Sequence, residues 1–231
     1  MKITPMLELG KAFVDVFYPD YCQVCRTSLH LKEKHVCLNC AYDLPYIERS
    51  EYAQKSLNQR FWGRVDVKGV YSLLDYQKGN QAQRLLHQIK YHKKKKLGFY
   101  LGYLLGNNMI DKAQFDVILP IPLHPKKQRL RGFNQSTTIA NGIAKRMGVE
   151  VVERYLVRNT FSRSQTKFSR FDRWENVRNI FQVNHAQHLE GKRILVVDDV
   201  LTTGATLEAA IRELLKVESV EVSIATVAAR M

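Results

Sequence analysis

The chain has 231 residues, enough to bury one α/β core and a smaller appendage. Its formal net charge of +14 and pI of about 9.7 favour anionic partners, which include nucleic acid, anionic membrane surfaces and phosphate-rich small molecules. The sequence has no apolar run long enough to span a bilayer and no signal peptide at its N-terminus, so we expect a cytoplasmic protein.

An amphipathic helix is predicted at the N-terminus. Apolar side chains recur at near-helical spacing over Ile3–Phe17, and Pro19 ends the pattern. We interpret this segment as a helix that docks on the module that follows. A membrane-surface anchor, at the inner face of the membrane, is the alternative, because Phe-rich amphipathic helices also lie in interfaces.

All four cysteines lie in one segment, as Cys22-x2-Cys25 and Cys37-x2-Cys40. Each pair supplies two thiolates from one tight turn, which suits a tetrahedral zinc ion, and four protein ligands leave no open position for chemistry. Disulfides would need an oxidising compartment that nothing here suggests, and a redox role for one pair leaves the other unexplained. We predict a structural zinc module over Tyr21–Leu44.

The middle of the chain carries weaker patterns. Glu48–Phe61 is polar and is interpreted as a linker. The predicted elements that follow are a strand or hairpin over Arg64–Tyr76, a helix over Gln81–Tyr91 capped by Asn80 and ending near Lys90, a basic run over His92–Lys96 and a glycine-containing helix over Leu97–Met109.

From Phe115 onward, strands and helices alternate. Strands are predicted over Phe115–Ile121, Val149–Tyr155, Ile180–Val183, Ile194–Val197 and Ser219–Val227, with helices over Gln135–Met147 and Ala205–Lys216. This alternation predicts an α/β fold, with a mostly parallel sheet flanked by helices and a ligand at the carboxyl ends of the strands. We therefore divide the chain into an N-terminal helix and zinc module, residues 1–48, and an α/β domain, residues 49–231.

The most informative motif is RILVVDDVLTTGAT, over Arg193–Thr206. Its apolar strand ends in Asp198 and Asp199, and a polar turn then leads into a helix. The turn offers backbone N–H groups to a phosphate, and Gly204 lets the backbone approach closely. The hydroxyls available there belong to Thr202, Thr203 and Thr206. Carboxylates beside an anion are expected to accept hydrogen bonds from sugar hydroxyls or to hold a metal ion.

A basic loop is predicted over Pro120–Gln135, directly after a strand. Its cations are Lys126, Lys127, Arg129 and Arg131. Gly132 and Asn134 then permit a turn into the next helix. Several cations on one loop suit a pyrophosphate. A solvated basic loop without a ligand is the alternative.

A second basic loop, over Arg158–Arg178, mixes cations with aromatic residues. Its polar members are Arg158, Arg163, Gln165, Lys167, Arg170, Arg173, Asn176 and Arg178, and its aromatic members are Phe161, Phe168, Phe171 and Trp174. A loop this long in a compact domain is typical of a lid or a binding element, and this composition also suits single-stranded nucleic acid. An ordinary mobile surface loop is the alternative.

Taken together, these motifs resemble the ComF family (ComFC type) of phosphoribosyltransferase-like proteins. The resemblance runs nearly end to end, through the cysteine module, LLHQIKY, PLHPKKQRLRGFNQ, the second basic loop and VVDDVLTTGAT, although DD-x-x-TTGAT alone marks only the type I phosphoribosyltransferases. The family is associated with natural transformation. The resemblance implies a type I phosphoribosyltransferase-like fold that binds phosphoribosyl pyrophosphate (PRPP) with Mg²⁺. It also implies a cytoplasmic factor that handles incoming single-stranded DNA alongside competence or DNA-processing proteins.

The same resemblance implies roles for particular residues. Asp198 and Asp199 would hold the ribose hydroxyls directly or through Mg²⁺. The 5-phosphate would be held by Thr202, Thr203, Gly204, Ala205 and Thr206. The further PRPP-binding candidates are Pro122, Leu123, His124, Lys126, Arg131 and Lys90. Arg170 or Lys167 would close on the ligand from the second basic loop.

One departure from the transferases leaves the activity open. Transferases of known chemistry carry a hood that binds the nucleophile, and only four residues follow Val227, so we expect the N-terminal half to supply it. Three functions therefore compete. They are a competence protein that uses the PRPP site while handling DNA, an active transferase acting on a base or amine, and a zinc-module adaptor at the membrane. We favour the first, with the third as a component of it.

Overall fold

The computed structural model describes residues 19–30, 33–48, 50–109, 114–158 and 180–231. The helix predicted over Ile3–Phe17 and residues 159–178 of the second basic loop lie outside the described residues. In chain order the elements are α2 (Leu38–Tyr42), α3 (Glu51–Gln59), β1 (Gly69–Asp75), α4 (Gln81–Tyr91), α5 (Lys95–Met109), β2 (Val117–Pro120), α6 (Pro125–Arg131), α7 (Gln135–Met147), β3 (Leu156–Arg158), β4 (Phe181–Val183), η1 (Ala186–His188), β5 (Arg193–Leu201), α9 (Ala205–Leu214) and β6 (Glu221–Ala229).

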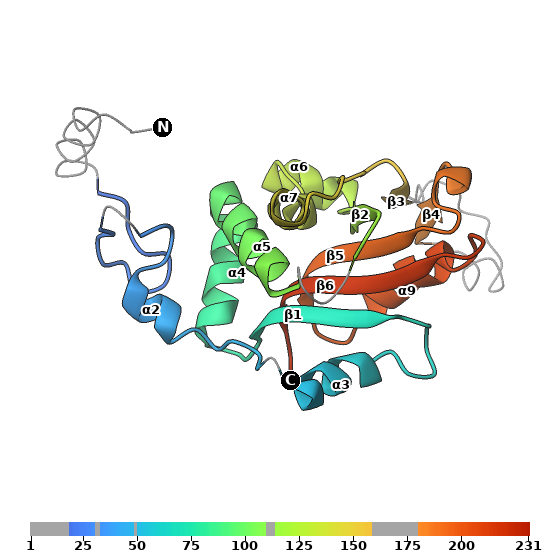
Figure 1. Cartoon of the computed structure of the whole chain (residues 1–231). Helices are drawn as coiled ribbons and strands as arrows, with labels where there is room; N and C mark the ends of the chain where they lie inside the picture. Colours follow the sequence, from blue (N-terminus) through green and yellow to red (C-terminus); the bar gives the residue numbers. More distant parts are fainter. Residues whose placement is uncertain (1–18, 31–32, 49, 110–113, 159–179) are drawn as a thin grey trace, which may run out of the picture.

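A four-stranded sheet in the order β1-β6-β5-β2 forms the centre of the molecule (Figure 1). Every pairing in it is parallel, with Leu119 opposite Val196 and Val196 opposite Ile224. The predicted mostly parallel sheet flanked by helices is therefore confirmed. Its carboxyl edge is the place where an α/β sheet binds ligands.

Alternating side chains of β5 face two different layers of helices. Leu195 and Val197 pack into one core cluster with α4, α5 and α7, whereas Ile194 and Val196 pack into the other with α3 and α9. This alternation follows from the two-residue period of a strand. The result is a sheet buried on both faces, as its near-continuous aliphatic sequence indicates.

Helices α4 and α7 match their predicted bounds because residues that commonly cap helices stand at their ends. The Asn80 side chain accepts a hydrogen bond from the Gln83 backbone N–H at 3.1 Å and begins α4. Asn134 begins α7 in the same way, and Gly148 ends it in the left-handed conformation.

Helices α5 and α7 touch backbone to backbone. A Cβ atom on Gly102 would lie 2.1 Å from the carbonyl oxygen of Ile139, and one on Gly142 would lie 2.1 Å from that of Phe99. No larger residue fits either position without moving a helix. The glycines of the predicted helix 97–109 therefore serve close helix packing.

The linker predicted over Glu48–Phe61 is wrong, because this segment contains helix α3. The Ser50 hydroxyl caps it by accepting from the Ala53 backbone N–H at 3.2 Å. Ala53, Leu57 and Phe61 recur every four residues and are buried against the sheet. The polar majority of the segment hides this narrow apolar stripe.

Other predicted elements differ in extent or pairing. Val149–Tyr155 is not a strand, since it makes only the isolated bridge between Ile118 and Val151 among the described residues. The strand predicted over Ile180–Val183 exists as β4, but it pairs antiparallel with β3 in a separate small sheet. The strand predicted over Arg64–Tyr76 begins only at Gly69. The first basic loop contains the short helix α6, which starts with Pro125 in its first turn.

The cysteine module packs against the α4–α5 side of the sheet (Figure 1). Val36, Cys40 and Leu44 share a core cluster with Leu97 and Leu101 of α5. Within the described part of the chain, no helix is both long and apolar enough to cross a bilayer.

Candidate functional site

The two adjacent carboxylates lie inside a strand and not after it. Strand β5 runs to Leu201, so Asp198 and Asp199 belong to its carboxyl half, and Asp198 pairs in register with Thr226 of β6. The expectation that the strand ends at Val197 is therefore wrong. Parallel pairing with β6 carries the extended backbone on past the carboxylates to the edge of the sheet.

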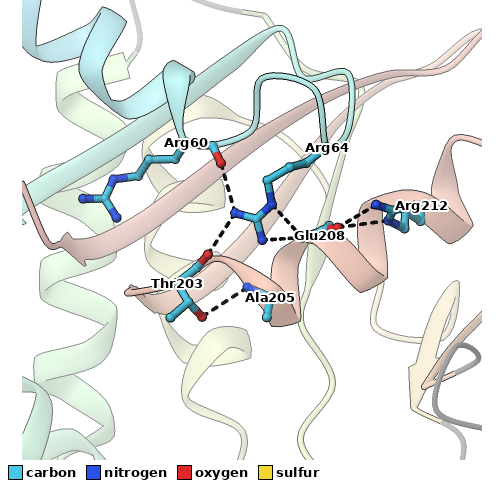
Figure 2. Close-up of polar contacts among 6 residues, drawn as sticks. All are labelled: Arg60, Arg64, Thr203, Ala205, Glu208 and Arg212. Atoms are coloured by element: carbon cyan, nitrogen blue, oxygen red, sulfur yellow. Dashed lines mark hydrogen bonds and ion pairs between the residues drawn. The ribbon is translucent and has the colours of Figure 1, made fainter.

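The turn after β5 presents the N-terminus of α9 to solvent. Gly204, which precedes α9, adopts φ 78° and has no side chain to cap the helix, while the Thr203 hydroxyl accepts from the Ala205 backbone N–H at 3.5 Å (Figure 2). A Cβ atom there would also lie 3.2 Å from the Phe61 ring, so both conformation and space favour glycine. The neighbouring residues of the turn are exposed: Thr202, Thr203, Ala205 and Thr206. Such an N-terminus attracts anions.

Arginines that follow α3 hold the carbonyl groups of this turn. Arg60 donates to the Thr202 carbonyl at 2.8 Å, and Arg64 donates to the Thr203 carbonyl at 3.0 Å. Arg64 also forms an ion pair with Glu208 of α9, and Glu208 in turn binds Arg212 (Figure 2). These arginines lower the pKa of the Glu208 carboxyl, Arg212 more than Arg64. The turn is thus braced from outside, on the side of its carbonyls.

Lys90, at the end of α4, reaches the second carboxylate. Its Nζ lies 2.9 Å from Oδ2 of Asp199, which is only 7% exposed. Helix α4 therefore places a cation directly at the carboxyl half of β5. The structure brings together these two residues, both of which the sequence singled out.

Asp198 has a different set of partners. Its Oδ1 accepts from the Ser136 hydroxyl at 2.9 Å and from the Asp199 backbone N–H at 2.8 Å. Burial and, to a lesser degree, the nearby charge of Asp199 raise the pKa of Asp198 to about 7, although the hydrogen bonds and Lys90 oppose this rise. Asp198 therefore titrates near neutral pH, where small changes in its surroundings alter its charge.

Arg158, the last described residue before the second basic loop continues, lies in the field of the same carboxyl. Burial lowers the pKa of the Arg158 guanidinium, and the charge of Asp198 opposes that effect. The two catalytic candidates from this loop, Lys167 and Arg170, lie outside the described residues.

In the first basic loop, His124 caps a helix and Arg131 is held in position by its neighbours. His124 accepts from the Lys126 backbone N–H through Nδ1 at 3.2 Å, so it caps α6. Lys126 is exposed, and Pro122 and Leu123 are partly buried before the cap. Arg131 donates to the Gln135 side chain at 3.0 Å and covers the Tyr91 ring at 5.6 Å. Arg131 thus contacts a neighbour of Lys90 and a neighbour of Ser136.

Asn134 joins this loop to the sheet. Its side chain donates to the Ile121 carbonyl at 2.9 Å and accepts from the Ser136 backbone N–H at 3.1 Å. Gln135 beside it is 1% exposed, and its Nε2 has no hydrogen-bond partner among the described residues. A buried amide nitrogen without a partner is costly unless a ligand or water completes it.

Several of these residues carried no separate signal in the sequence. Ser136, Arg60, Arg64 and Glu208 are ordinary polar residues on helices or beside them, and their partners lie far along the chain. Ser136 and Asp198 are 62 residues apart, and Arg60 and Thr202 are 142 residues apart. Only the RGFNQS run, which ends in Ser136, drew attention to its surroundings.

The cysteines gather as the spacing predicted. One sulfur from each of Cys22, Cys25, Cys37 and Cys40 lies within 4.8 Å of all the others, and the Cys25 and Cys37 sulfurs are 3.7 Å apart. Tetrahedral ligands at the usual zinc–sulfur distance would be separated by about 3.8 Å. The backbone N–H groups of Val24 and Cys37 also point to the Cys22 sulfur at 3.4 Å. The donor set fits zinc.

Comparison with known proteins gives a consistent picture. A family model described as the phosphoribosyl transferase domain matches residues 134–231. The chain is 24% identical to competence protein F of Haemophilus influenzae over 210 residues, covering 83% of this chain and 89% of that protein. It is 26% identical to DNA utilization protein YhgH of Salmonella typhimurium over 208 residues, 82% of this chain and 88% of that protein.

Among solved structures, a glutamine PRPP amidotransferase from B. subtilis superposes with a TM-score of 0.42 at 20% identity, covering 60% of this chain and 30% of that one. A purine phosphoribosyltransferase from Pyrococcus horikoshii superposes with a TM-score of 0.35 at 17% identity, covering 56% and 80%. The family match and the parallel sheet together identify a type I phosphoribosyltransferase fold.

Proposed function

Because the chain is a ComF-type phosphoribosyltransferase-like protein, we propose that it binds PRPP with Mg²⁺ at the carboxyl edge of β5. We further propose that it does so in the cytoplasm while handling incoming single-stranded DNA during natural transformation. Competence or DNA-processing proteins would then be its partners. The observation that carries the proposal is the contact of Lys90 with Asp199 and of Ser136 with Asp198, next to an exposed helix N-terminus.

Each group in the site has a defined task in this proposal. The backbone N–H groups at Gly204–Thr206 and the hydroxyls of the turn hold the 5-phosphate. Asp198 and Asp199 accept hydrogen bonds from the ribose hydroxyls, directly or through Mg²⁺. Lys90 and Arg131 supply positive charge for the pyrophosphate, and so does exposed Lys126, which lies on α6 together with Arg131. Mg²⁺, when bound, would neutralise the charge of the pyrophosphate.

Gln135, next to Ser136 at the start of α7, is a buried amide in the same part of the protein. Its Oε1 accepts from Arg131 at 3.0 Å, while its Nε2 is inaccessible and unpaired among the described residues. An ordered water would satisfy this donor.

Active transfer is the second candidate, and the adjacent carboxylates in the carboxyl half of β5, with Lys90 beside them, favour it. In that reaction a nitrogen nucleophile forms a bond to the anomeric carbon, while the bond from that carbon to the pyrophosphate oxygen breaks and pyrophosphate leaves with the electron pair. The proton that the nitrogen loses passes to solvent. Pyrophosphate release that depends on one particular nucleophile would favour this candidate.

We also propose that Cys22, Cys25, Cys37 and Cys40 hold a structural zinc ion. Their sulfurs lie close enough together for tetrahedral ligation, and no position is left for a substrate. The ion would fix the turns of the module, including the wall that it packs against α5.

Calorimetric titration of PRPP with Mg²⁺ into the zinc-loaded chain tests the proposal. We expect binding by the wild type, loss of binding in Asp199→Asn, and unchanged binding in Asp66→Asn, which removes an exposed carboxylate outside the site. Repeating the titration with an oligonucleotide present should shift the affinity if the site responds to DNA. A folded, zinc-loaded wild type that binds no PRPP would contradict the proposal.

A further inference from the structure

A groove of about 710 Å³ lies between the cysteine module, α5 and α7, outside the proposed PRPP site. Its aromatic residues are Phe99, Tyr100 and Tyr103, all from α5. The Tyr100 ring packs on the His35 ring of the module at 5.6 Å between centroids, which ties one wall to the other. The groove is therefore a built junction between the module and the α/β domain.

Among the described residues that line this groove, the charged side chains are all basic. They are Lys34, Lys95, Lys96 and Lys145, and each of them is exposed. None of these lysines forms an ion pair with any residue that the structure describes. Unpaired cations from three separate elements converge here, so the groove has a strong preference for an anionic ligand.

The aromatic side chains offer flat, solvent-facing surfaces. Phe99 is 38% exposed and Tyr103 is 40% exposed, although both types of side chain are usually well buried. They lie four residues apart on α5, so they share a face and are separated by about 6 Å along the helix axis. Two neighbouring rings at this spacing can each stack on a planar group.

The contact between α5 and α7 fixes these side chains relative to the lysine of the other helix. Gly142 lets the α7 backbone touch the Phe99 carbonyl, so Thr138 and Lys145 of α7 lie beside Phe99 and Tyr103. A groove whose floor is a backbone contact keeps its shape without a ligand. This preorganisation lowers the entropic cost of binding.

The groove also adjoins the proposed PRPP site. Lys95 lies 5.2 Å from the centroid of the Phe133 ring, and Phe133 directly precedes Asn134, the cap of α7. The exposed run His92–Lys96 joins the end of α4, where Lys90 contacts Asp199, to the start of the groove. A positively charged path therefore connects the two.

We propose that this groove binds single-stranded nucleic acid, with bases stacked on Phe99 and Tyr103 and phosphates against the surrounding lysines. The inference rests on the proposed handling of single-stranded DNA and names the surface that carries it. Aromatic platforms within a cationic groove are the combination that recognises unpaired bases without sequence preference. A duplex keeps its bases stacked inside, so it gains only the phosphate contacts.

Fluorescence anisotropy with a labelled oligo-dT and the zinc-loaded full chain tests this surface. Phe99→Ala/Tyr103→Ala should weaken binding by at least about 10-fold, because each lost stacking contact is large. Tyr52→Ala, which removes an 82% exposed ring on α3, is the matched control and should bind like the wild type. Lys34→Gln/Lys145→Gln should reduce the salt slope of log K by about 1.4, whereas Lys55→Gln/Lys78→Gln should not reduce it.

The outcomes separate the groove from the wider proposal. If the wild type binds no oligo-dT, the handling of single-stranded DNA fails and the groove fails with it. If the wild type binds but the groove variants match their controls while melting normally, DNA binding stands and lies elsewhere. Equal affinity for duplex DNA, or competition by an acidic peptide or anionic vesicles but not by unlabelled oligo-dT, would overturn the stacking mode.

Discussion

Lys90 Nζ lies 2.9 Å from Asp199 Oδ2, so the last turn of α4 and the carboxyl half of β5 are joined by a largely buried ion pair. The pair places a cation at the point where the ribose and the pyrophosphate of PRPP are proposed to meet. A carboxylate that is ready for sugar hydroxyls or Mg²⁺ would be costly to bury alone. Lys90 neutralises it in the free protein.

Removing the lysine should therefore cost stability. Lys90→Met leaves the Asp199 charge buried without a partner and is expected to lower the free energy of unfolding by roughly 2–4 kcal/mol. Lys93→Met, at an exposed position in the same basic run, is the control and should change little. Denaturant unfolding measures both. The double variant Lys90→Met/Asp199→Asn should recover much of the loss, and failure to recover it would show that the pair is not the cause.

The stability should also depend on pH through Asp198. Its pKa is raised from 3.8 to about 7, so the unfolded chain releases the proton at lower pH than the folded chain does. As pH rises through this interval the folded state loses stability relative to the unfolded state. Asp198→Asn removes the titration and should raise the free energy of unfolding at pH 8 by roughly 3–4 kcal/mol relative to its effect at pH 4, since a difference of one in pKa corresponds to about 1.4 kcal/mol. Urea titrations at these pH values measure it, and an equal effect at both would contradict the raised pKa.

Arg60 and Arg64, which we call the arginine brace, hold the carbonyls of the turn after β5. Weakening this brace should lower the affinity for PRPP while the protein still folds. Arg64→Ala frees the Thr203 carbonyl and breaks the ion pair with Glu208, so the phosphate-binding turn should loosen. We expect PRPP affinity to fall by about 10-fold, equivalent to about 1.4 kcal/mol. Arg212→Ala is the matched control, because Arg212 binds the same Glu208 but contacts no part of the turn in the interactions described. Similar affinities for the two variants would contradict the role of the brace.

Because α5 and α7 approach closely at Gly102 but not at Gly98, replacing these two glycines by alanine should change the free energy of unfolding by different amounts. Gly102→Ala puts a Cβ atom 2.1 Å from the Ile139 carbonyl oxygen and forces the helices apart. The expected cost is about 2 kcal/mol or more in the free energy of unfolding. Gly98→Ala meets the Thr138 side chain only at 3.3 Å, so the gain in helix propensity should offset most of its cost. Thermal unfolding of the two variants measures this difference. Equal stabilities would contradict a dominant role of the backbone contact at Gly102.

Removal of zinc should affect the groove more than the PRPP site. Cys40→Ser, or chelation of the wild type, releases the module from α5 and is expected to cost several kcal/mol of stability locally. Oligo-dT binding should weaken, because the module forms one wall of the groove. PRPP binding should persist, because none of its proposed contacts comes from the module. Metal analysis together with both titrations tests this, and equal losses of the two ligands would argue for global unfolding.

The sequence predicts the elements whose signals are local. Helices α4 and α7 match their predicted bounds because Asn80 and Asn134 mark where they begin, and the cysteine cluster follows from spacing alone. Helix α3 was missed because only Ala53 and Leu57 within it are buried apolar residues. Val149–Tyr155 has the composition of a strand, but the chain makes only one bridge there.

Some residues of the candidate site have a local sequence signal, and others do not. The motif predicted Asp198, Asp199 and the turn, whereas Lys90 was a candidate only through the family resemblance. Ser136 and the arginines of the brace depend on how distant segments fold together, and no local pattern reports that. Tertiary contacts of this kind also set the pKa of Asp198, since burial beside Asp199 causes it.

A crystal structure of the zinc-loaded chain with PRPP and Mg²⁺ bound would test the proposed PRPP site. We expect the 5-phosphate at the N-terminus of α9, within hydrogen-bond distance of the backbone N–H groups at Gly204–Thr206, and the ribose hydroxyls at Asp198 and Asp199. Lys90 should then contact the ligand as well as Asp199. Density for PRPP elsewhere, with the turn after β5 empty and the Lys90–Asp199 pair unchanged, would contradict it.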